Sequence, residues 1–546
     1  MRHGGKILVD QLVRFGVQRV FSVPGESFLA ALDGLHDVAI DNIVCRQEGG
    51  AAMMAEAYGK LTGQPGVLFV TRGPGATNAS AGIHIAHQDS TPMVVFVGQI
   101  RRSDRHREAF QEVDYTQMFG GLAKWVAEVN QTERLPEYIA RAFNVATSGR
   151  PGPVVLALPE DMLSALANAT DTAQNPSTLV PNWSAAAAET LRWLSDFERP
   201  LVIVGGPHWS SDAANDLAQF STVQRLPVAL GFRRQDYLDN RCPNYAGDLN
   251  VGMNPKLAQR VRDADALLVI GSRLGDIETL GYSLIDPANP HCAIAHVHAD
   301  PAELSRVYRP DLSIVADAPS FVRALADLPN TGTDRSAWVK SARADYDAWI
   351  SPQETPGDVK LEQVIKTLSD ILPDDAILTN GAGNYAAWLH RYFVYKTYGT
   401  QLAPTSGSMG YGFPAAISAS IEHPDKTVVC LAGDGCFQMT LNELSTAAQY
   451  GAMPIVIVVN NGRYGTIRMH QEKTYPGRVS GTMLANPDFS ALARSYGGHG
   501  ETVTQTADFV NAFARAKASQ TFALIELKVD EDALSTSLTL SGLAAP

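Results

Sequence analysis

The stretch TVVCLAGDGCFQMTLNELSTAAQYGAMPIVIVVNNGRYG, residues 427–465, is the part of this sequence that decides the fold. An apolar run ends in Gly433-Asp434-Gly435, a helical pattern follows, and a second apolar run ends in Asn460-Asn461. Asp434 and Asn461 are therefore expected at the carboxyl ends of two strands that flank one helix, 27 residues apart. Because apolar strands that alternate with helices are typical of parallel sheets covered on both faces, the pattern predicts an α/β fold.

The same stretch has the chemistry of a phosphate and metal site. Glycines at a helix start let backbone N–H groups approach phosphate oxygens, and the helix N-terminus favours their negative charge. Asp434 and Asn461 offer the hard oxygen ligands that Mg²⁺ takes when it also binds a diphosphate. Either half alone is explained by ordinary turn chemistry, an N-cap Asp or an Asn-Gly turn. Together, at this spacing, they predict a magnesium–diphosphate site.

The rest of the chain repeats this alternation of strand and helix. Its 546 residues are too many for one hydrophobic core and suggest about three domains. The apolar runs expected to form strands are GVQRVFSV, DNIVC, GVLFVT, PMVVFVG, GPVVLAL, PLVIVGG, PVALG, ALLVIGS, AIAHVHAD, DAILTN, TVVCLAGDG, IVIVVNN and ALIELKV.

Two polar stretches interrupt the rhythm and separate the expected domains. The stretch near 165–188 has the composition of a linker, and the stretch near 328–358 that of a linker containing a helix. We therefore expect three doubly wound α/β domains with parallel sheets. Their predicted ranges are 1–170, 185–330 and 355–546.

Composition excludes several classes of function. The net charge is −13 without a long basic run, which argues against a nucleic-acid partner. Five scattered cysteines without a CxxC pair argue against a disulfide framework or a zinc site and fit a reducing cytoplasm. The N-terminus reads as an amphipathic helix rather than a signal peptide, and no apolar stretch approaches the roughly 18 residues of a membrane span. We expect a soluble cytoplasmic protein without a membrane partner.

GDG followed by NN at this distance resembles the motif of thiamine diphosphate enzymes. The resemblance to acetolactate synthase-like and related 2-oxoacid enzymes covers nearly the whole chain, and it implies a thiamine diphosphate-binding fold. By this resemblance Asp434, the Asn461 side chain and the main-chain carbonyl of Arg463 bind Mg²⁺. Backbone groups that would meet the diphosphate belong to Gly433, Gly435, Cys436 and Phe437.

Two segments upstream of this motif also match the family. TSGSMGYGFPAAISA resembles the segment whose bulky apolar residue props the cofactor into a bent shape; that residue would be Met409, beside Ser408. Core packing is the ordinary explanation of a lone methionine, but the surrounding match favours the cofactor role. The loop GAGNYA has the form of a dinucleotide fingerprint, but no acidic residue follows about 20 residues later at a strand end. We expect this loop on the other side of the diphosphate, with Asn384 as a contact.

The first third supplies the expected second half of the cofactor site. NIVCRQEGGAAMM places Glu48 directly after a strand, where an isolated Glu usually serves the helix dipole. In the family this Glu contacts the cofactor's aminopyrimidine, and sharing a proton there promotes deprotonation of the thiazolium C2. The resulting ylid attacks a carbonyl, and the thiazolium then accepts the electrons. VTRGPGATNASAG resembles the pyrimidine-binding loop, with Gly73, Pro74, Gly75 and Asn78 at the matching positions.

Residues near this loop are candidates for substrate contact. REAFQEVDYTQMFG matches the acetolactate synthase pattern, which implies that Phe110 and Gln111 line the substrate space. Arg72 stands where relatives often have a small residue; it could attract a substrate carboxylate or form a surface ion pair, and both alternatives stay open. His84 and His87, spaced i, i+3, are expected in packing or a hydrogen-bonded helix face rather than at a metal.

Two absences bear on the reaction. Thr71 stands where benzoylformate decarboxylases have a histidine, and the sequence has no adjacent His-His pair like that of pyruvate decarboxylases. Both argue against simple decarboxylation to an aldehyde.

The middle third resembles the family's central domain, which binds FAD in some members. Arg273 and Asp276 in GSRLGD fit the FAD-binding version, whereas GDLNVGMNPKLAQ departs from it. FAD, an adenosine ligand and a purely structural domain all remain open.

The resemblance therefore predicts a thiamine diphosphate-dependent carboligase or lyase that acts on a small 2-oxoacid or diketone through a C2 ylid and an enamine/carbanion. The alternatives are a flavin-dependent oxidase, a simple decarboxylase, or a degenerate cofactor-binding subunit without turnover. Retention of Glu48, Met409, Asp434 and Asn461 speaks against the last. In the family the two half-sites meet across a subunit interface, which implies a homodimer as the smallest active unit and a homotetramer as the expected assembly.

Overall fold

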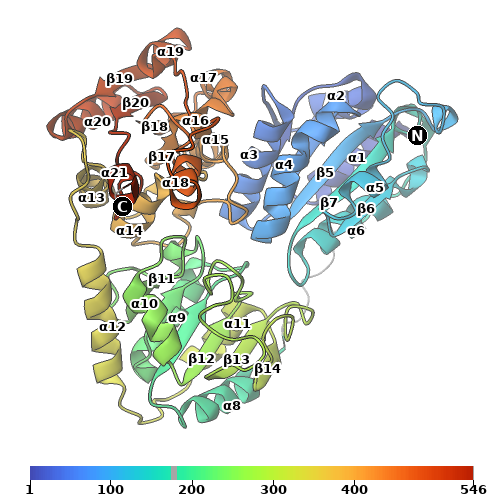
Figure 1. Cartoon of the computed structure of the whole chain (residues 1–546). Helices are drawn as coiled ribbons and strands as arrows, with labels where there is room; N and C mark the ends of the chain where they lie inside the picture. Colours follow the sequence, from blue (N-terminus) through green and yellow to red (C-terminus); the bar gives the residue numbers. More distant parts are fainter. Residues whose placement is uncertain (174–180, 545–546) are drawn as a thin grey trace.

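Three six-stranded sheets, each parallel throughout, organise the chain (Figure 1). The structure is a computed structural model that describes residues 1–173 and 181–544. The prediction of three α/β domains with parallel sheets is confirmed. Part of the linker predicted near 165–188 lies outside the described residues.

The N-terminal sheet has the strand order β3-β2-β4-β5-β7-β6. Its strands are β2 (Arg19–Ser22), β3 (Asp41–Val44), β4 (Gly66–Val70), β5 (Met93–Gln99), β6 (Trp125–Glu128) and β7 (Pro153–Pro159). The helices are α1 (Gly4–Arg14), α2 (Leu29–His36), α3 (Glu48–Thr62), α4 (Pro74–Asp89), α5 (Tyr115–Phe119), α6 (Leu135–Thr147) and α7 (Glu160–Ser164). A short antiparallel pair, β1 (Arg2–His3) with β8 (Leu166–Ala167), joins the two ends of this domain. The amphipathic helix predicted at the N-terminus is α1.

The central sheet has the order β11-β10-β9-β12-β13-β14. Its strands are β9 (Pro200–Val204), β10 (Val228–Leu230), β11 (Tyr245–Asp248), β12 (Ala266–Ile270), β13 (Ala293–His298) and β14 (Leu312–Val315). The helices are α8 (Ser184–Leu194), α9 (Ser211–Gln224), α10 (Pro255–Asp263) and α11 (Ala318–Ala326). Helix α12 (Ser336–Trp349), yellow in Figure 1, lies within the stretch expected to be a linker containing a helix.

The C-terminal sheet has the order β16-β15-β17-β18-β20-β19. Its strands are β15 (Ile377–Asn380), β16 (Gln401–Leu402), β17 (Val428–Gly433), β18 (Ile455–Asn460), β19 (His499–Val503) and β20 (Ala523–Lys528). The helices are α13 (Leu361–Ile371), α14 (Ala386–Tyr392), α15 (Gly412–Glu422), α16 (Asp434–Gln438), α17 (Leu444–Tyr450), α18 (Gly465–Thr474), α19 (Phe489–Ser495), α20 (Phe509–Ala518) and α21 (Leu540–Ala544).

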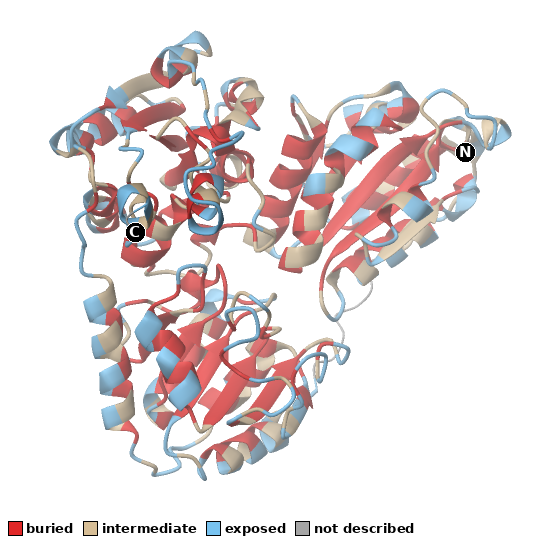
Figure 2. Ribbon diagram, viewed as in Figure 1, coloured by how far each residue is buried: buried red, intermediate tan, exposed pale blue. Residues whose placement is uncertain are grey.

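The strands form the buried interior of each domain (Figure 2). One hydrophobic cluster continues from the N-terminal into the C-terminal domain, where α3 packs against α15. At this contact the Ser418 hydroxyl donates a 3.0 Å hydrogen bond to the Met54 carbonyl. The two domains that carry the predicted half-sites are therefore packed together within one chain. In the part of the chain that the structure describes, no helix combines the length and apolarity needed to cross a bilayer.

Candidate functional site

The predicted diphosphate residues lie at the carboxyl edge of the C-terminal sheet. Strands β17 and β18 are parallel neighbours, and Gly433 pairs with Val459, so Asp434 begins α16 beside the end of β18. The loops that follow β15, β17 and β18 line one cavity of ≈ 250 Å³. Predicted site residues in its lining are Asn384, Met409, Gly433, Asp434, Gly435, Cys436, Asn461 and Arg463. The fold thus brings all three residues proposed to hold the metal to one cavity.

Asp434 is held by a set of N–H donors. Its Oδ1 accepts a 2.8 Å hydrogen bond from the Gly435 N–H, and its Oδ2 accepts from the Gly462 N–H at 2.9 Å and the Asn486 amide at 2.8 Å. Burial raises the pKa of Asp434 above its ordinary value, although these donors favour the charged form. A divalent cation in the cavity would supply the positive charge that neutral donors do not.

Two glycines leave the cradle backbone free of side chains. A Cβ on Gly433 would lie 2.9 Å from a ring carbon of Tyr385, and one on Gly435 would lie 2.5 Å from a ring carbon of Tyr464. Both distances are shorter than real Cβ contacts, so the aromatic rings require glycine at these positions. A backbone cradle at the start of α16, with Asp434 and Asn461 beside it, fits a diphosphate and its divalent cation.

Met409 lines the cavity from a loop between β16 and α15. It also packs against the hydrophobic cluster of the C-terminal domain. Gly407 and Gly410, both with positive φ (+68° and +80°), bracket Ser408 and Met409. This left-handed backbone on either side turns the dipeptide sharply, which places Met409 at the cavity while the Ser408 hydroxyl pairs with Ser406 at 2.9 Å.

Phe437 and Cys436 differ in their surroundings although they are neighbours. The Phe437 side chain packs in the core, with ring centroids 5.3 Å from Phe413 and 5.9 Å from Phe489. The Cys436 thiol lines the cavity, and its Sγ accepts hydrogen bonds from the Tyr385 hydroxyl at 3.3 Å and from the Gly410 N–H at 3.1 Å. Cys436 therefore joins the start of α16 to the loop that carries Met409. A diphosphate contact at Phe437 involves its backbone only.

Both polar atoms of the Asn384 side chain are hydrogen-bonded within the protein. Its amide donates a 2.8 Å hydrogen bond to the Leu534 carbonyl, and its Oδ1 accepts from the Thr466 hydroxyl at 3.0 Å. These contacts tie the loop after β15 to α18 and to a segment near the C-terminus that also lines the cavity. Asn384 thereby shapes the wall of the cavity.

The N-terminal residues gather into a second cluster at the starts of α3 and α4. Glu48 is the first residue of α3, its side chain is 9% exposed, and its Oε2 accepts a 2.9 Å hydrogen bond from the Asn78 amide. Pro74 is the first residue of α4. A Cβ on Gly75 would lie 3.2 Å from Glu48 Oε1, so the absence of a side chain there keeps this oxygen accessible.

Gly73 connects this cluster to the predicted substrate segment. With φ at +61° it turns the chain into α4, and its N–H donates a 2.8 Å hydrogen bond to the Tyr115 hydroxyl. A Cβ on Gly73 would lie 2.8 Å from Cβ of Gln111, so Gln111 lies directly against the pyrimidine-loop glycine. Phe110, next to it, is 76% exposed.

The structure places Arg72 in an ion-pair network. Its guanidinium donates to Glu160 at 2.9 Å and to Glu26 at 3.0 Å, and the side chain is nearly buried. These contacts correspond to the ion-pair alternative, although the Arg72 ion pairs are less exposed than the surface pair considered from the sequence.

Thr71 is next to Arg72, and its hydroxyl pairs with that of Ser27 at 2.8 Å. His87, on α4, is half-buried, and burial lowers its pKa.

The two clusters are separate within one chain. All residues that line the ≈ 250 Å³ cavity lie between Leu361 and Leu534, in the C-terminal domain. The Glu48 cluster belongs to the N-terminal domain and is outside that lining. The Glu48 cluster and the Asp434 cavity are therefore two separate groups of residues within one chain.

Sequence reasoning missed two residues that line the cavity, Tyr385 and Tyr464, and one that contacts its lining, Asn486. Asn486 bridges Asp434 and the side chain of Asn460, donating to each at 2.8 Å. Tyr385 and Tyr464 cover the two cradle glycines. The tyrosines lie in segments that the sequence already indicated as loops of the site. Both could therefore have been predicted as neighbours of the glycines. Asn486 lies in the segment LANPDF, which has no local feature that points to Asp434.

A smaller cavity of ≈ 120 Å³ lies where the three domains meet. Arg273 and Asp276, the residues that resemble an FAD-binding domain, line it together with Arg234 and His298.

Comparison with known proteins agrees with the fold of three domains. Residues 2–118 match the thiamine pyrophosphate enzyme N-terminal TPP binding domain, residues 187–325 the central domain, and residues 381–527 the C-terminal TPP binding domain. The order of the three domains, with a half-site in the first and in the last, defines the class of thiamine pyrophosphate enzymes.

Two similar proteins identify the family within this class of enzymes. The chain is 30% identical to the acetolactate synthase isozyme 2 large subunit of Escherichia coli (strain K12), over 97% of this chain and 96% of that protein. It is 32% identical to the acetolactate synthase large subunit of Parasynechococcus marenigrum (strain WH8102), over 96% of this chain and 87% of that protein. The chain belongs to the acetolactate synthase-like family, and it is a thiamine diphosphate-dependent enzyme of the carboligase type.

Proposed function

We propose that this enzyme decarboxylates a small 2-oxoacid and joins the remaining acyl unit to a second carbonyl compound, forming a hydroxyketone. CO2 leaves, a bond forms between the acyl carbon of the 2-oxoacid and the carbonyl carbon of the second compound, and the oxygen of that second carbonyl, now an alkoxide, takes up a proton. The observation that carries the proposal is the single cavity that Asp434, Asn461 and Met409 line together. Thiamine diphosphate, when bound, supplies the carbon that attacks a carbonyl and holds the electron pair released with CO2.

The chain's own residues have distinct parts in this proposal. Asp434, the side chain of Asn461 and the carbonyl of Arg463 hold Mg²⁺, and the glycine cradle binds the diphosphate. Met409, which lines the cavity, would support the bound cofactor. Glu48 holds a proton at Oε1, because Asn78 occupies Oε2 and Gly75 leaves the first oxygen accessible. Its role is to pass that proton to and from the aminopyrimidine ring.

We propose further that a homodimer is the smallest active unit, with a homotetramer as its assembly in the cytoplasm. The separation of the Glu48 cluster from the Asp434 cavity supports the dimer, since a second copy can supply the missing half of each site. The five free cysteines fit a reducing compartment. Phe110 and Gln111 would contact substrate from the N-terminal half-site. The proposal includes no flavin step.

A substrate panel tests the reaction. The enzyme, with thiamine diphosphate and Mg²⁺, is incubated separately with pyruvate, 2-oxobutyrate, glyoxylate, benzoylformate and cyclic diketones. CO2 release is followed together with product structure by NMR. We expect CO2 and a hydroxyketone from pyruvate or a close 2-oxoacid, and none from the Asp434→Ala variant. Acetaldehyde as the sole product of pyruvate would contradict carboligation, and hydrogen peroxide would indicate the oxidase.

A further inference from the structure

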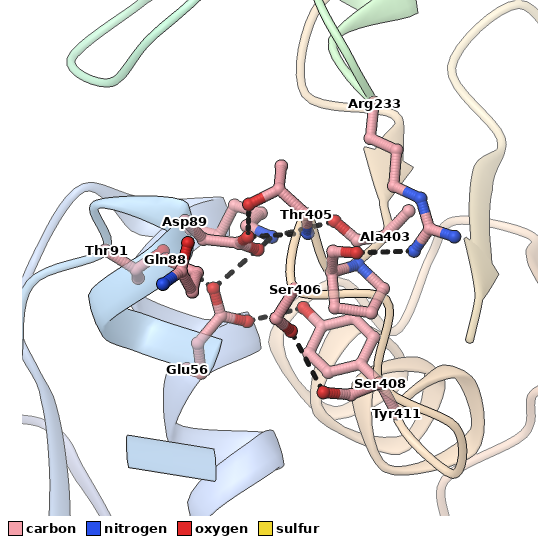
Figure 3. A network of polar contacts seen from close by, with 12 residues as sticks. Glu56, Gln88, Asp89, Thr91, Arg233, Ala403, Thr405, Ser406, Ser408 and Tyr411 are labelled. Atoms are coloured by element: carbon pink, nitrogen blue, oxygen red, sulfur yellow. Dashed lines mark hydrogen bonds and ion pairs between the residues drawn. The ribbon is translucent and has the colours of Figure 1, made fainter. Parts of the chain in front are cut away.

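The loop that carries Met409 is held by charged residues of another domain. We define the Met409 loop as residues 403–411, between β16 and α15. Figure 3 shows Glu56 and Asp89 of the N-terminal domain facing Thr405 and Tyr411 of this loop. The loop is thus held from outside its own domain, by residues that do not line the cavity that Met409 lines.

The start of the loop is fixed by Asp89, the last residue of α4. The Thr405 N–H donates a 2.6 Å hydrogen bond to Asp89 Oδ1, and the Thr405 hydroxyl donates to the same oxygen. Asp89 Oδ2 forms an ion pair with Lys60, whose ammonium group also donates to the Ala403 carbonyl at 3.1 Å. Three contacts from two N-terminal side chains therefore fix residues 403–405.

The end of the loop is fixed by Glu56, one turn before Lys60 on α3. The Tyr411 hydroxyl donates a 2.5 Å hydrogen bond to Glu56 Oε2. Glu56 Oε1 accepts from the Thr91 hydroxyl at 2.6 Å and lies 3.3 Å from Lys60 Nζ. Lys60 thus bridges the carboxylates that hold the two ends of the loop.

The central domain adds two arginines to this network. Arg233 donates to the Pro404 carbonyl at 2.6 Å, and Arg234 donates to the Asp89 carbonyl at 3.1 Å. Glu56 and Asp89 are both fully buried. Burial raises the pKa of Glu56; at Asp89 burial acts in the same direction, but Lys60 and Arg234 outweigh it and lower the pKa. The Asp89 carboxylate is accordingly charged and paired.

A buried charge network of this kind is weak evidence of a role in stability alone. Burying ion pairs carries a desolvation penalty that often offsets their attraction, and apolar side chains of similar volume can be as stable. What such a network supplies is fixed geometry, since each oxygen is satisfied in one arrangement only. The tip of the loop requires such fixed geometry, because Gly407 and Gly410 give its backbone unusual conformational freedom.

We propose that Glu56, Lys60 and Asp89 are positioning residues that hold Met409 at the cofactor by clamping both ends of the Met409 loop. None of the three lines the ≈ 250 Å³ cavity, so they act through the loop. The inference rests on the proposed function in one respect, the contact of Met409 with thiamine diphosphate. The competing explanation is that the network only joins the domains.

The first test uses the cofactor-free protein. Hydrogen exchange by mass spectrometry is compared for wild type, Asp89→Asn and Glu303→Gln. Glu303 is a matched control, because its buried carboxylate pairs with Arg150 at 2.8 Å across the N-terminal and central domains without contacting the loop. We expect Asp89→Asn to raise exchange in peptides covering residues 403–411, and Glu303→Gln to leave it unchanged. Equal exchange of these peptides in all three proteins would overturn the clamp.

The second test is a double-mutant cycle with Met409→Ala. At saturating cofactor, Asp89→Asn should lower kcat about 10- to 100-fold with little change in substrate KM, the size expected for misplacement of a positioned group. In the Met409→Ala background the same substitution should have little further effect, because both changes act through one residue. Binding of thiamine diphosphate by calorimetry should show the same non-additivity, and Lys60→Arg should retain more activity than Lys60→Met.

The outcomes separate the two proposals. If Met409→Ala leaves cofactor binding and kcat at wild-type values, the proposed cofactor contact of Met409 is wrong. If Met409→Ala impairs them but Asp89→Asn has no more effect than Glu303→Gln, only the positioning role is wrong. Additive effects of Asp89→Asn and Met409→Ala would also overturn it, since Asp89 would then act independently of Met409.

Discussion

The amide of Asn78 donates a 2.9 Å hydrogen bond to the carboxylate of Glu48, linking the second turn of α4 to the first turn of α3. This bond fixes the orientation of a carboxylate at the edge of the N-terminal domain and leaves Oε1 beside the bare backbone of Gly75. In the proposed dimer this oriented carboxylate would meet the aminopyrimidine ring of a cofactor that the Asp434 cavity of the second copy would hold.

Glu48→Ala should separate cofactor binding from turnover. The metal and diphosphate anchors lie in the other half-site, so the Kd of thiamine diphosphate should change little. Turnover should fall about 10²- to 10⁴-fold, the usual contribution of a positioned acid–base group. Asn78→Ala should give a smaller loss of about tenfold, consistent with a hydrogen bond to a charged group. Calorimetry and steady-state kinetics check both; a large loss of cofactor affinity in Glu48→Ala would contradict the assignment.

Asp434→Ala should abolish retention of thiamine diphosphate in magnesium buffer, because the diphosphate then lacks a metal ligand. Asn486→Ala removes only a residue that orients Asp434, and its cofactor affinity should fall about 10- to 100-fold. Fluorescence quenching of Trp388, which lines the cavity, measures both. Wild-type affinity in Asp434→Ala would show that the metal is held elsewhere.

Mixing Glu48→Ala with Asp434→Ala should restore activity. In a heterodimer one site inherits both changes, whereas the other combines an intact Glu48 with an intact Asp434 of the partner chain. With random exchange about half the dimers are heterodimers with one good site of two, so recovery should approach about a quarter of wild type. Subunit exchange is verified by mass spectrometry of tagged chains. Complete exchange without recovered activity would mean that each site is built within one subunit.

Gly435→Ala should weaken cofactor binding by displacing Tyr464, since the added Cβ would lie 2.5 Å from its ring. The displaced ring belongs to the cavity wall, so the effect should appear in the Kd of thiamine diphosphate as well as in the Tm. Gly121→Ala is the control, because a Cβ there meets nothing within 4 Å. Equal cofactor affinity in both variants would show that the cradle tolerates a side chain.

The pH dependence of stability should reflect His298. Burial lowers the pKa of His298 from 6.5 to about 4. Below pH 6.5 the unfolded chain binds a proton that the folded protein does not, so this stabilisation is present above pH 6.5 and is lost as the pH falls towards 4. The full effect is about 3 kcal/mol. His298→Asn should show a smaller drop in Tm between pH 7 and pH 5, measured by calorimetry; an identical drop would contradict the shift.

The interior strands were predictable from the sequence, and the missed strands were all at sheet edges. Apolar runs identified the central strands of each sheet because these are covered on both faces. In the three six-stranded sheets the strands without such a run are β6, β11, β14, β16 and β19, and each ends its sheet; the two short strands of the β1–β8 pair also lack one. In β19, the sequence HGETV has only Val503 fully buried, so an edge strand need not be apolar and leaves little signal.

What the sequence by itself determined is the chemistry at the ends of strands. Asp434, Asn461 and Glu48 were recognisable because each follows an apolar run at a helix start or turn, and successive strands such as β17 and β18 are usually neighbours in a sheet. Local order in the chain therefore defines each half-site. The class of enzyme follows from the two half-sites and their order.

Only the tertiary structure decided how these pieces are supported. It gave Asp434 its contact with Asn486, committed Arg72 to Glu160 and Glu26, and joined Asp89 to Thr405 across 316 residues of chain. Such contacts depend on how segments far apart in the chain pack, within one domain or between two, and no periodicity or spacing in the chain encodes that packing. The sequence alone does not show which charged residue is buried or which residue pairs with it. The pairing is set in three dimensions, because each buried polar atom must be satisfied.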